Sequence, residues 1–369
     1  MDRSPTGESP PPRSFEAARL DIRLGAVAHN WRECCRLSGT AVSGVVKADA
    51  YGLGLAPVAR ALEDAGCDTF FVARLGEGMA LRPIVPKARI FVLDGAAPDA
   101  VPALIAHKLT PVLNSLADLA NWSSSSRPDA AIHIDTGMNR LGLPPDELAV
   151  LIAESKTRLS GVNVVLLMSH LACADDPGHE MNKLQRDRFR AALAKLPPAP
   201  ASLASSGGVL LGRDYAFDIV RPGLGLYGGN PQPGQPNPFR TAVRLTGSIL
   251  QVRRVDAGQT VGYGASYRTG RNSTLATVAL GYADGLMRAI GNRGKASIAG
   301  KRAPIVGCVS MDLITLDVTD IPDVNVGDEA EFLGETITPE ELAADSGTAA
   351  YEIFTSLSRR AHRRYEAAR

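Results

Sequence analysis

The sequence AVSGVVKADAYGLG at residues 41–54 places one lysine, Lys47, at the end of an apolar run and just before a glycine-rich turn. Residues 41–46 have the composition of a short buried strand. A lysine at the rim of such a strand can extend its amine into a site while its methylene stem packs. This position suits a lysine that forms a Schiff base, although a lysine that only carries its charge out to solvent would also fit Lys47 taken alone.

Repeated strand-then-helix units extend from this stretch towards the C-terminus. Between Ala41 and about Gly229, β-branched runs alternate with amphipathic segments such as 179–196, the pattern expected around a parallel sheet. Eight such runs begin near residues 41, 69, 88, 110, 130, 162, 201 and 217. We therefore predict an α/β fold with a TIM-type (β/α)8 barrel over residues 15–240, preceded by a disordered tail at residues 1–14.

The composition changes after a loop rich in proline and glycine at residues 229–238. The runs beyond it are short, β-rich and separated by turns, at residues 241–255, 274–280, 303–309, 313–318 and 329–333. Residues 241–369 should therefore form a mostly β domain. One late helix is expected after Thr338, because threonine can cap a helix and Pro339 suits its first position.

The charge balance favours a small-molecule role, since 40 lysines and arginines face 39 acidic residues and no global field would attract nucleic acid or a membrane surface. The five cysteines are scattered, without metal-ligand spacing, and are expected to be reduced thiols. The N-terminus is polar and no stretch approaches the roughly 18 apolar residues of a membrane span, so we expect a cytoplasmic protein. The basic run at residues 359–364 could bind an acidic partner, but such a run is more often a solvated end.

Polar residues follow the runs where a TIM barrel carries its chemistry, at the carboxyl ends of the strands. We expect them to face one mouth of the barrel. They are Lys47 after the first run, residues 135–140 after the fifth, Ser169-His170 after the sixth, Ser205-Ser206 after the seventh, and Arg221-Pro222-Gly223 after the eighth.

Local motifs in both halves resemble those of alanine racemases, which are enzymes that use pyridoxal 5'-phosphate. The resemblance spans residues 18 to about 360 and keeps the order of the family. Beside the Lys47 segment, the motifs are LDIRLGAVAHN (20–30), DTGMNRLG (135–142), SHLA (169–172), VRPGLGLYG (220–228), VGYGASY (261–267), GYADG (281–285) and SMD (310–312).

The resemblance implies a catalytic role for two residues. Lys47 would bind the cofactor as a Schiff base and exchange the Cα proton on one face of the substrate, and Tyr263 would serve the other face. Racemisation needs proton exchange on both faces of a planar carbon, so two bases are the minimal solution. A phenol with an ordinary pKa of about 10 needs a nearby cation or donor to act as a base, and the resemblance assigns this to His170 and Arg221.

The other implied contacts surround the cofactor and substrate. Arg221 would face the pyridine nitrogen, and Arg140 the phenolic oxygen and the substrate. The Met311 amide would meet the substrate carboxylate, and Tyr282 would line the entrance. The phosphate would be bound by Tyr51, Ser206, the amides of Gly223 and Leu224, and Tyr351. A head-to-tail homodimer would share its sites between subunits, and the implied role is D-alanine supply for peptidoglycan.

Three positions depart from the family pattern. His133 stands where many members carry a carbamylated lysine that orients the motif arginine, so a bound anion or water could substitute, or His133 could be a satisfied interior side chain. Cys308 replaces an arginine, which leaves the entrance group of Tyr282, Arg288 and Asp175 without one cation. Ser205 replaces a frequent asparagine.

Other functions stay open at this point. A broad-specificity amino-acid racemase would share all of these residues, and substrate breadth cannot be read from side chains around an unseen pocket. A decarboxylase of the same general plan would be distinguished by loss of carbon dioxide. A non-catalytic cofactor-binding protein would need neither the second domain nor the second base.

Overall fold

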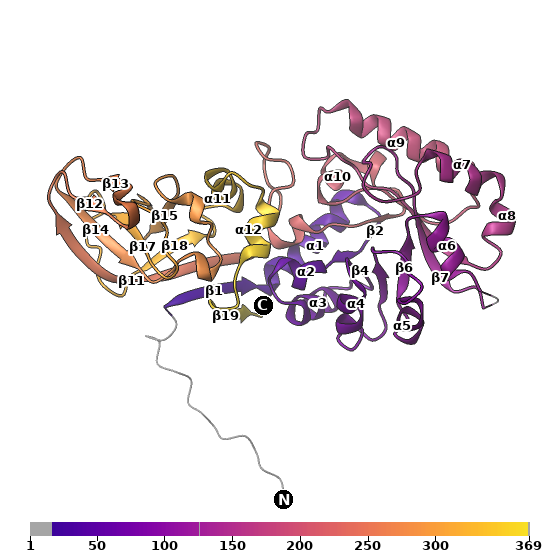
Figure 1. Ribbon diagram of the computed structural model, residues 1–369, viewed down its shortest axis with the longest axis horizontal. Coiled ribbons are helices and arrows are strands. Elements are labelled where there is room, and N and C mark those ends of the chain that lie inside the picture. Colours follow the sequence, from indigo (N-terminus) through magenta and orange to yellow (C-terminus); the bar gives the residue numbers. More distant parts are fainter. Residues whose placement is uncertain (1–16, 125, 368–369) are drawn as a thin grey trace, which may run out of the picture. The chain divides into compact units, whose positions relative to one another are not determined.

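The computed structural model describes residues 17–124 and 126–367 and divides the chain into two compact units (Figure 1). One unit contains Arg23–Ala242. The other combines the N-terminal segment that ends at Ile22 with Val243–Tyr365. The second unit is therefore assembled from two separate parts of the sequence.

The first unit is a closed barrel of parallel strands. Strands β3 to β9 pair in chain order, β10 pairs with β2, and a parallel bridge from Ser205 to Arg221 joins the run of β9 to that of β10. All eight predicted runs are confirmed as strands. These are β2 (Ala41–Val42) with β3 (Gly44–Val45), β4 (Thr69–Val72), β5 (Arg89–Val92), β6 (Thr110–Leu113), β7 (Asp129–His133), β8 (Asn163–Met168), β9 (Ala201–Ser202) and β10 (Ile219–Val220).

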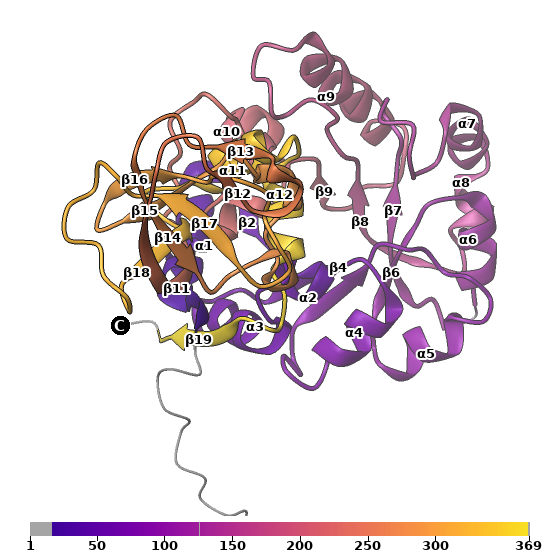
Figure 2. The same ribbon diagram turned by 60° about the vertical axis from the view of Figure 1, so that its left-hand side comes forward.

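Helices connect these strands, and α4 to α9 lie outside the sheet (Figure 2). The aromatic rings of Phe71 and Phe91, on adjacent strands, stack with centroids 4.6 Å apart in the buried interior. Burial of each such side chain stabilises the barrel by about 1.5–3 kcal/mol. The helices are α1 (Leu24–Ser38), α2 (Lys47–Tyr51), α3 (Leu55–Asp64), α4 (Leu75–Leu81), α5 (Val101–Ala106), α6 (Leu116–Trp122), α7 (Pro145–Ala153), α8 (Ser155–Arg158), α9 (Glu180–Leu193) and α10 (Ser206–Leu210), with 3-10 turns η2 (Arg213–Tyr215) and η3 (Leu224–Tyr227).

Acidic side chains near helix starts tie successive barrel units together. In α7, Glu147 accepts a hydrogen bond from the N–H of Leu116, the first residue of α6, at 2.8 Å. In α6, Asp118 accepts from the N–H of Ala96, in the loop after β5, at 3.3 Å. Each carboxylate satisfies an amide that a loop or helix start would otherwise leave unpaired.

The second unit is built on antiparallel strands around the 13-residue β11. The main sheet has the order β16-β15-β18-β11-β1-β19, while β14 pairs with β11 and β17 pairs with β14. Its strands are β1 (Ala18–Arg23), β11 (Val243–Val255), β12 (Thr260–Val261), β13 (Tyr267–Arg268), β14 (Ser273–Val278), β15 (Lys295–Ile298), β16 (Lys301–Pro304), β17 (Ile314–Asp317), β18 (Glu329–Leu333) and β19 (His362–Glu366), with helices α11 (Pro339–Ser346) and α12 (Ala350–Ser356) and turns η4 (Tyr263–Ala265), η5 (Tyr282–Asp284) and η6 (Arg288–Ile290).

The assignment of residues 15–240 to the barrel needs correction at its start. Strand β1 pairs with β11, with Leu20 opposite Leu245, and therefore belongs to the β-rich unit. Leu20 and Ile22 are fully buried, so the pairing of β1 with β11 buries the apolar face of β1 in the β-rich unit and not in the barrel. The barrel unit ends at Ala242, and the tail expected at residues 1–14 lies outside the described residues.

Two further expectations concern helices. The late helix is confirmed as α11, where the Thr338 side chain accepts a hydrogen bond from the N–H of Glu341 at 3.2 Å and Pro339 is the first residue. Across the described parts of the chain, every helix is too short or too polar to cross a bilayer.

Candidate active site

Lys47 lies at the carboxyl end of β3, where the sequence predicted it. The side chain is half-buried. Burial lowers its pKa, the charge of Arg140 lowers it further, and the carboxylate of Glu77 opposes both effects. A lysine whose pKa is lowered has a larger fraction of neutral amine, which is the nucleophilic form.

The backbone after Lys47 is left-handed over four residues in a row. Ala48, Asp49, Ala50 and Tyr51 have φ values between 53° and 56°. Outside glycine this conformation costs roughly 1–2 kcal/mol per residue, so surrounding contacts must hold it in place. The turn closes through the N–H of Gly52, which donates to the carbonyl of Ala48 at 2.7 Å.

Arg221 supplies a buried cation at the end of β10. Its side chain donates to the carbonyl of Ser169 at 2.6 Å and to the hydroxyl of Ser202, and it lies 3.4 Å from Nδ1 of His170. These partners are all uncharged. Burial lowers the pKa of Arg221 to about 9, which still leaves the guanidinium charged at neutral pH.

Two imidazoles near these cations are neutral. Burial, followed by the charge of Arg221, lowers the pKa of His170 well below its ordinary value and that of His133 to about 4. His133 Nδ1 lies 2.8 Å from Oδ1 of Asn114. The amide nitrogen of Asn114 donates to two backbone carbonyls, so its oxygen must accept, and Nδ1 of His133 carries the proton. This contact supports the interpretation of His133 as a satisfied interior side chain, while a bound anion or water beside Arg140 stays a prediction.

A cradle of hydroxyls and amides lies at the ends of β9 and β10, against Tyr51 of the turn that follows Lys47. Ser206 Oγ accepts hydrogen bonds from the N–H groups of Gly223, at 2.9 Å, and Gly225, at 3.1 Å. A Cβ on Gly223 would lie 2.2 Å from the hydroxyl of Tyr51, so a larger residue would have to displace the Tyr51 ring. The Tyr51 ring packs 4.8 Å from that of Tyr227. Neutral donors on a close-approach loop are suited to a phosphate group.

Four other predicted site residues belong to the β-rich unit. Tyr282 and Met311 are on adjacent loops, since the N–H of Tyr282 donates to the carbonyl of Ser310 at 3.0 Å. A Cβ on Gly281 would lie 2.3 Å from the carbonyl oxygen of Met311, so this contact requires glycine. These side chains are exposed by the following fractions: Tyr263 75%, Met311 52%, Tyr351 47% and Tyr282 41%.

The loop that carries Tyr263 is anchored although its ring is exposed. Ser266 Oγ lies 3.2 Å from Cys308 Sγ, and the side-chain amide of Asn292 donates to the carbonyl of Ser266 at 3.2 Å. Val261, just before the loop, is buried. Tyr263 is therefore an exposed side chain on an anchored loop, available to another surface.

Comparisons with known proteins identify the family. The model of the alanine racemase N-terminal domain matches residues 22–231, and that of the C-terminal domain matches residues 242–365. The chain belongs to the alanine racemase family. Curated alanine racemases of Acidiphilium cryptum and Rhizobium meliloti are 47% and 46% identical to it, over 93% and 95% of this chain and 97% of each relative.

Solved structures of alanine racemases are similar to this chain over nearly its whole length. The enzyme of Bartonella henselae, described with covalently bound pyridoxal phosphate, has a TM-score of 0.91 and 38% identity and covers 95% of this chain and 99% of its own. The biosynthetic alanine racemase of Pseudomonas aeruginosa has a TM-score of 0.90 and 31% identity, with coverages of 95% and 100%.

Three residues that contact the site in this member of the alanine racemase family were not predicted from the sequence. Asn114 follows β6 as the other polar residues follow their strands, so the same rule could have found it. Ser202 lies within β9 and accepts a hydrogen bond from Arg221, and it could have been found only by knowing which strand residues point into the barrel. Glu77 binds the turn after Lys47 from 29 residues away, and no local pattern reports such a contact.

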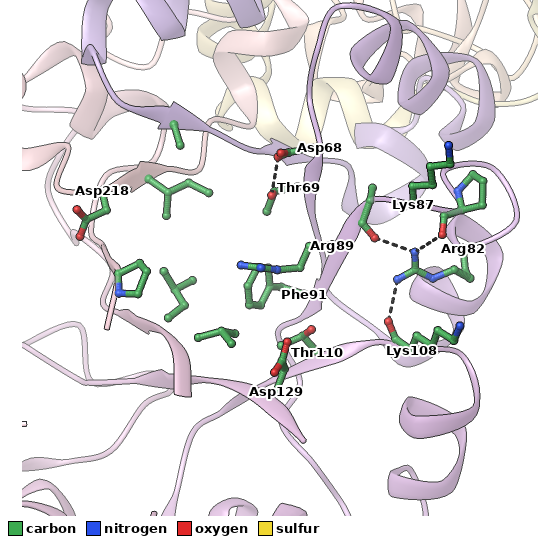
Figure 3. Close-up of a pocket in the computed structure, with 17 residues that line it drawn as sticks. Asp68, Thr69, Arg82, Lys87, Arg89, Phe91, Lys108, Thr110, Asp129 and Asp218 are labelled. Carbon is green, nitrogen blue, oxygen red and sulfur yellow. Dashed lines mark hydrogen bonds between the residues drawn. The ribbon is translucent and has the colours of Figure 1, made fainter. Parts of the chain in front are cut away.

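A cavity of about 690 Å³ lies at the opposite end of the barrel strands (Figure 3). Arg89 projects into it from the start of β5, and Thr69 and Thr110 line it from neighbouring strand starts. The guanidinium of Arg82, on its rim, is bound to backbone carbonyls, including that of Ala88 at 2.7 Å. This cavity contains none of the residues that the family motifs identify.

Proposed function

We propose that this chain is an alanine racemase that interconverts L- and D-alanine, with pyridoxal 5'-phosphate bound to Lys47. The observation that carries the proposal is the half-buried Lys47, whose pKa is lowered, together with a cradle of hydroxyls and amides. The nearly full-length match to curated alanine racemases supports it, as does the Bartonella henselae structure, described with covalently bound pyridoxal phosphate.

The donors present suit this cofactor. Tyr51, Ser206, the amides of Gly223 and Leu224, and Tyr351 would hold the phosphate. Arg221 would face the pyridine nitrogen, and Arg140 the phenolic oxygen and the substrate. When bound, pyridoxal phosphate supplies the electron-withdrawing ring that makes the Cα proton of an attached amino acid removable.

Two residues of the chain would move the proton. In one direction the neutral Lys47 amine would take the proton from Cα on one face, and the Tyr263 phenol would give its proton to Cα on the opposite face. In the reverse direction the Tyr263 phenolate would take the proton and the protonated Lys47 would give one back on its own face. Tyr263 needs a cation or donor within reach to act near neutrality, a role we assign to Arg221 and His170. The contact of 3.4 Å between those two side chains supports this pairing.

We further propose a head-to-tail homodimer in which Tyr263 of one subunit reaches the barrel of the other. The exposure of the Tyr263 ring supports this, because large aromatic side chains that a single subunit leaves exposed are often buried at an interface. Met311 and Tyr351 of the same unit are also exposed. The Met311 amide would meet the substrate carboxylate and Tyr282 would line the entrance. We place the enzyme in the cytoplasm, where it would supply D-alanine for peptidoglycan.

The first experiment follows the optical rotation of L-alanine after the purified protein is loaded with pyridoxal phosphate, with L-serine and L-lysine in parallel. Decay to zero with alanine alone supports the proposal. Decay with all three substrates would make this a broad-specificity racemase, and release of carbon dioxide without racemisation would replace the proposal with a decarboxylase. Growth of a D-alanine-requiring bacterium on the expressed gene would test the supply role.

Lys47 itself is tested by borohydride, which should fix the cofactor irreversibly on the peptide that contains it. The Lys47→Arg variant should lose this attachment and at least about 1000-fold in rate, since a guanidinium does not act as the amine nucleophile. Lys108→Arg, at the opposite end of the barrel, serves as the control and should keep both. Attachment of the cofactor to a different lysine would contradict the assignment.

A further inference from the structure

The left-handed turn at Ala48–Tyr51 is held from outside by one carboxylate. Oε1 of Glu77 accepts a hydrogen bond from the N–H of Ala48 at 2.6 Å. Ala48 is the first left-handed residue and directly follows Lys47. The contact therefore acts at the point where the backbone leaves the conformation of the strand.

The second oxygen of the same carboxylate fixes the neighbouring barrel unit. Oε2 of Glu77 accepts from the N–H of Ala73 at 2.8 Å and from that of Arg74 at 3.0 Å. These two residues form the turn between β4 and α4. Glu77 thus joins two adjacent strand-to-helix turns at the end of the barrel that carries Lys47.

The bond also accounts for a cost that the sequence imposes. Four consecutive residues other than glycine in the left-handed region are strained, because each Cβ comes too close to the following carbonyl oxygen. A hydrogen bond to an ionised carboxylate is among the strongest that a side chain can offer an amide, so it can offset part of this strain. Asp49 adds a second restraint, because its Oδ1 accepts from the N–H of Leu55 at 2.7 Å.

We propose that Glu77 is a positioning residue for Lys47, and that its carboxylate fixes the left-handed turn and through it the place of the amine. The proposal rests on the proposed function for its catalytic meaning. The charge of Glu77 also acts on Lys47, because this carboxylate raises the pKa of the Lys47 amine whereas burial and Arg140 lower it. Loss of Glu77 should therefore loosen the turn and lower the pKa of the amine further.

Two variants separate the hydrogen bond from the charge. Glu77→Ala removes both. Glu77→Gln keeps a carbonyl oxygen that can accept from Ala48, removes the charge, and sets an NH2 group against the amides of Ala73 and Arg74. The matched control is Glu147→Gln, because Glu147 accepts from the N–H of Leu116 at 2.8 Å in the same manner but away from Lys47.

The first measurement is hydrogen exchange of the peptide at residues 46–54 in the full-length protein, with and without cofactor. Loss of a charged hydrogen bond should speed exchange of the Ala48 amide about 10-fold or more in Glu77→Ala. The change in Glu77→Gln should be smaller, and Glu147→Gln should match the wild type. An unchanged exchange rate in Glu77→Ala would overturn the proposal whether or not the protein racemises alanine.

The second measurement is the pH dependence of kcat and of kcat/KM for the loaded enzyme. The acid limb should move to lower pH in both Glu77 variants, and kcat should fall about 10- to 100-fold in Glu77→Ala, as expected for a misplaced catalytic group. If Glu77→Ala does not fold, Glu77→Gln carries the test alone. An equal shift in Glu147→Gln would assign the effect to general loosening of the barrel and overturn the proposal, whereas a wild type without activity would remove only the proposed function.

Discussion

Single side chains of the barrel show how burial sets charge around Lys47. Arg221 is 5% exposed and has only uncharged hydrogen-bond partners, while His133 and His170 lie near it as neutral imidazoles. A buried cation without a carboxylate partner is costly to stability. We interpret this arrangement as suited to a ligand that carries negative charge. Such a ligand would supply the compensating charge that no carboxylate of the folded barrel gives to Arg221.

His133 gives a prediction for stability against pH. Its folded pKa is about 4, below the ordinary 6.5, so the unfolded chain takes up a proton between these values that the folded protein does not. The free energy of unfolding should therefore fall as the pH drops from 6.5 towards 4 and be independent of His133 above that window, with a total effect of about 3 kcal/mol.

The variant His133→Asn tests this, because an asparagine amide can replace Nδ1 as the donor to Asn114 and does not titrate. Urea unfolding at pH 7, 5.5 and 4.5 should show a shallower loss of stability in the variant than in the wild type. Some pH dependence should persist because burial also lowers the pKa of His170. Parallel curves for the two proteins would mean that His133 is not held neutral.

At the scale of elements, the strands of the barrel were predictable and the turn after Lys47 was not. Buried parallel strands read as continuous apolar runs, which is why the start of each run agrees with its strand to within two residues, as in β9 at Ala201 and β10 at Ile219. Alanine and tyrosine have no preference for positive φ, so nothing local marks Ala48–Tyr51 as left-handed. The placement of β1 likewise depends on a partner, Gly247 opposite Ala18, more than 200 residues away.

The same elements explain which parts of the site were accessible from sequence. Residues at strand ends, such as Lys47, Ser206 and Arg221, follow from topology alone, and the structure brings them to one end of the barrel. Contacts that cross between units, such as Glu77 with Ala48, depend on three-dimensional packing. The roles of these residues remain predictions.

Glycine substitutions should have opposite effects on two alanines of neighbouring elements. Ala48→Gly removes the strain of a left-handed alanine and should be neutral or stabilising by up to about 1 kcal/mol. Ala61→Gly, within α3, should destabilise by about 1 kcal/mol because glycine is a poor helix former. The urea midpoint of each variant measures this, and destabilisation by both substitutions would show that Ala48 is not strained.

At the scale of the whole molecule, the proposed catalytic residues are divided between two units of the chain. Lys47, Arg221 and Ser206 belong to the barrel, and Tyr263 and Met311 belong to the unit that β1 shares with Val243–Tyr365. The exposed Tyr263 ring belongs to an anchored loop and is therefore available to a second subunit. A closed two-fold dimer would use this surface twice.

Mixing two inactive variants tests whether sites are shared. Lys47→Ala and Tyr263→Phe should each abolish racemisation as homodimers. If Lys47 of one subunit works with Tyr263 of the other, a mixed dimer contains one site with both defects and one intact site. Random reassociation of equal amounts makes about half of the dimers mixed, so roughly one quarter of wild-type activity should return. Sites built within one subunit would leave every site in the mixture with one defect, and no activity would return.

Native mass spectrometry of the same mixture must show the mixed dimer, since subunits that do not exchange would also give no recovery. Dilution below the dissociation constant of the dimer should then remove the recovered activity, because the intact site exists only while the two different subunits are joined.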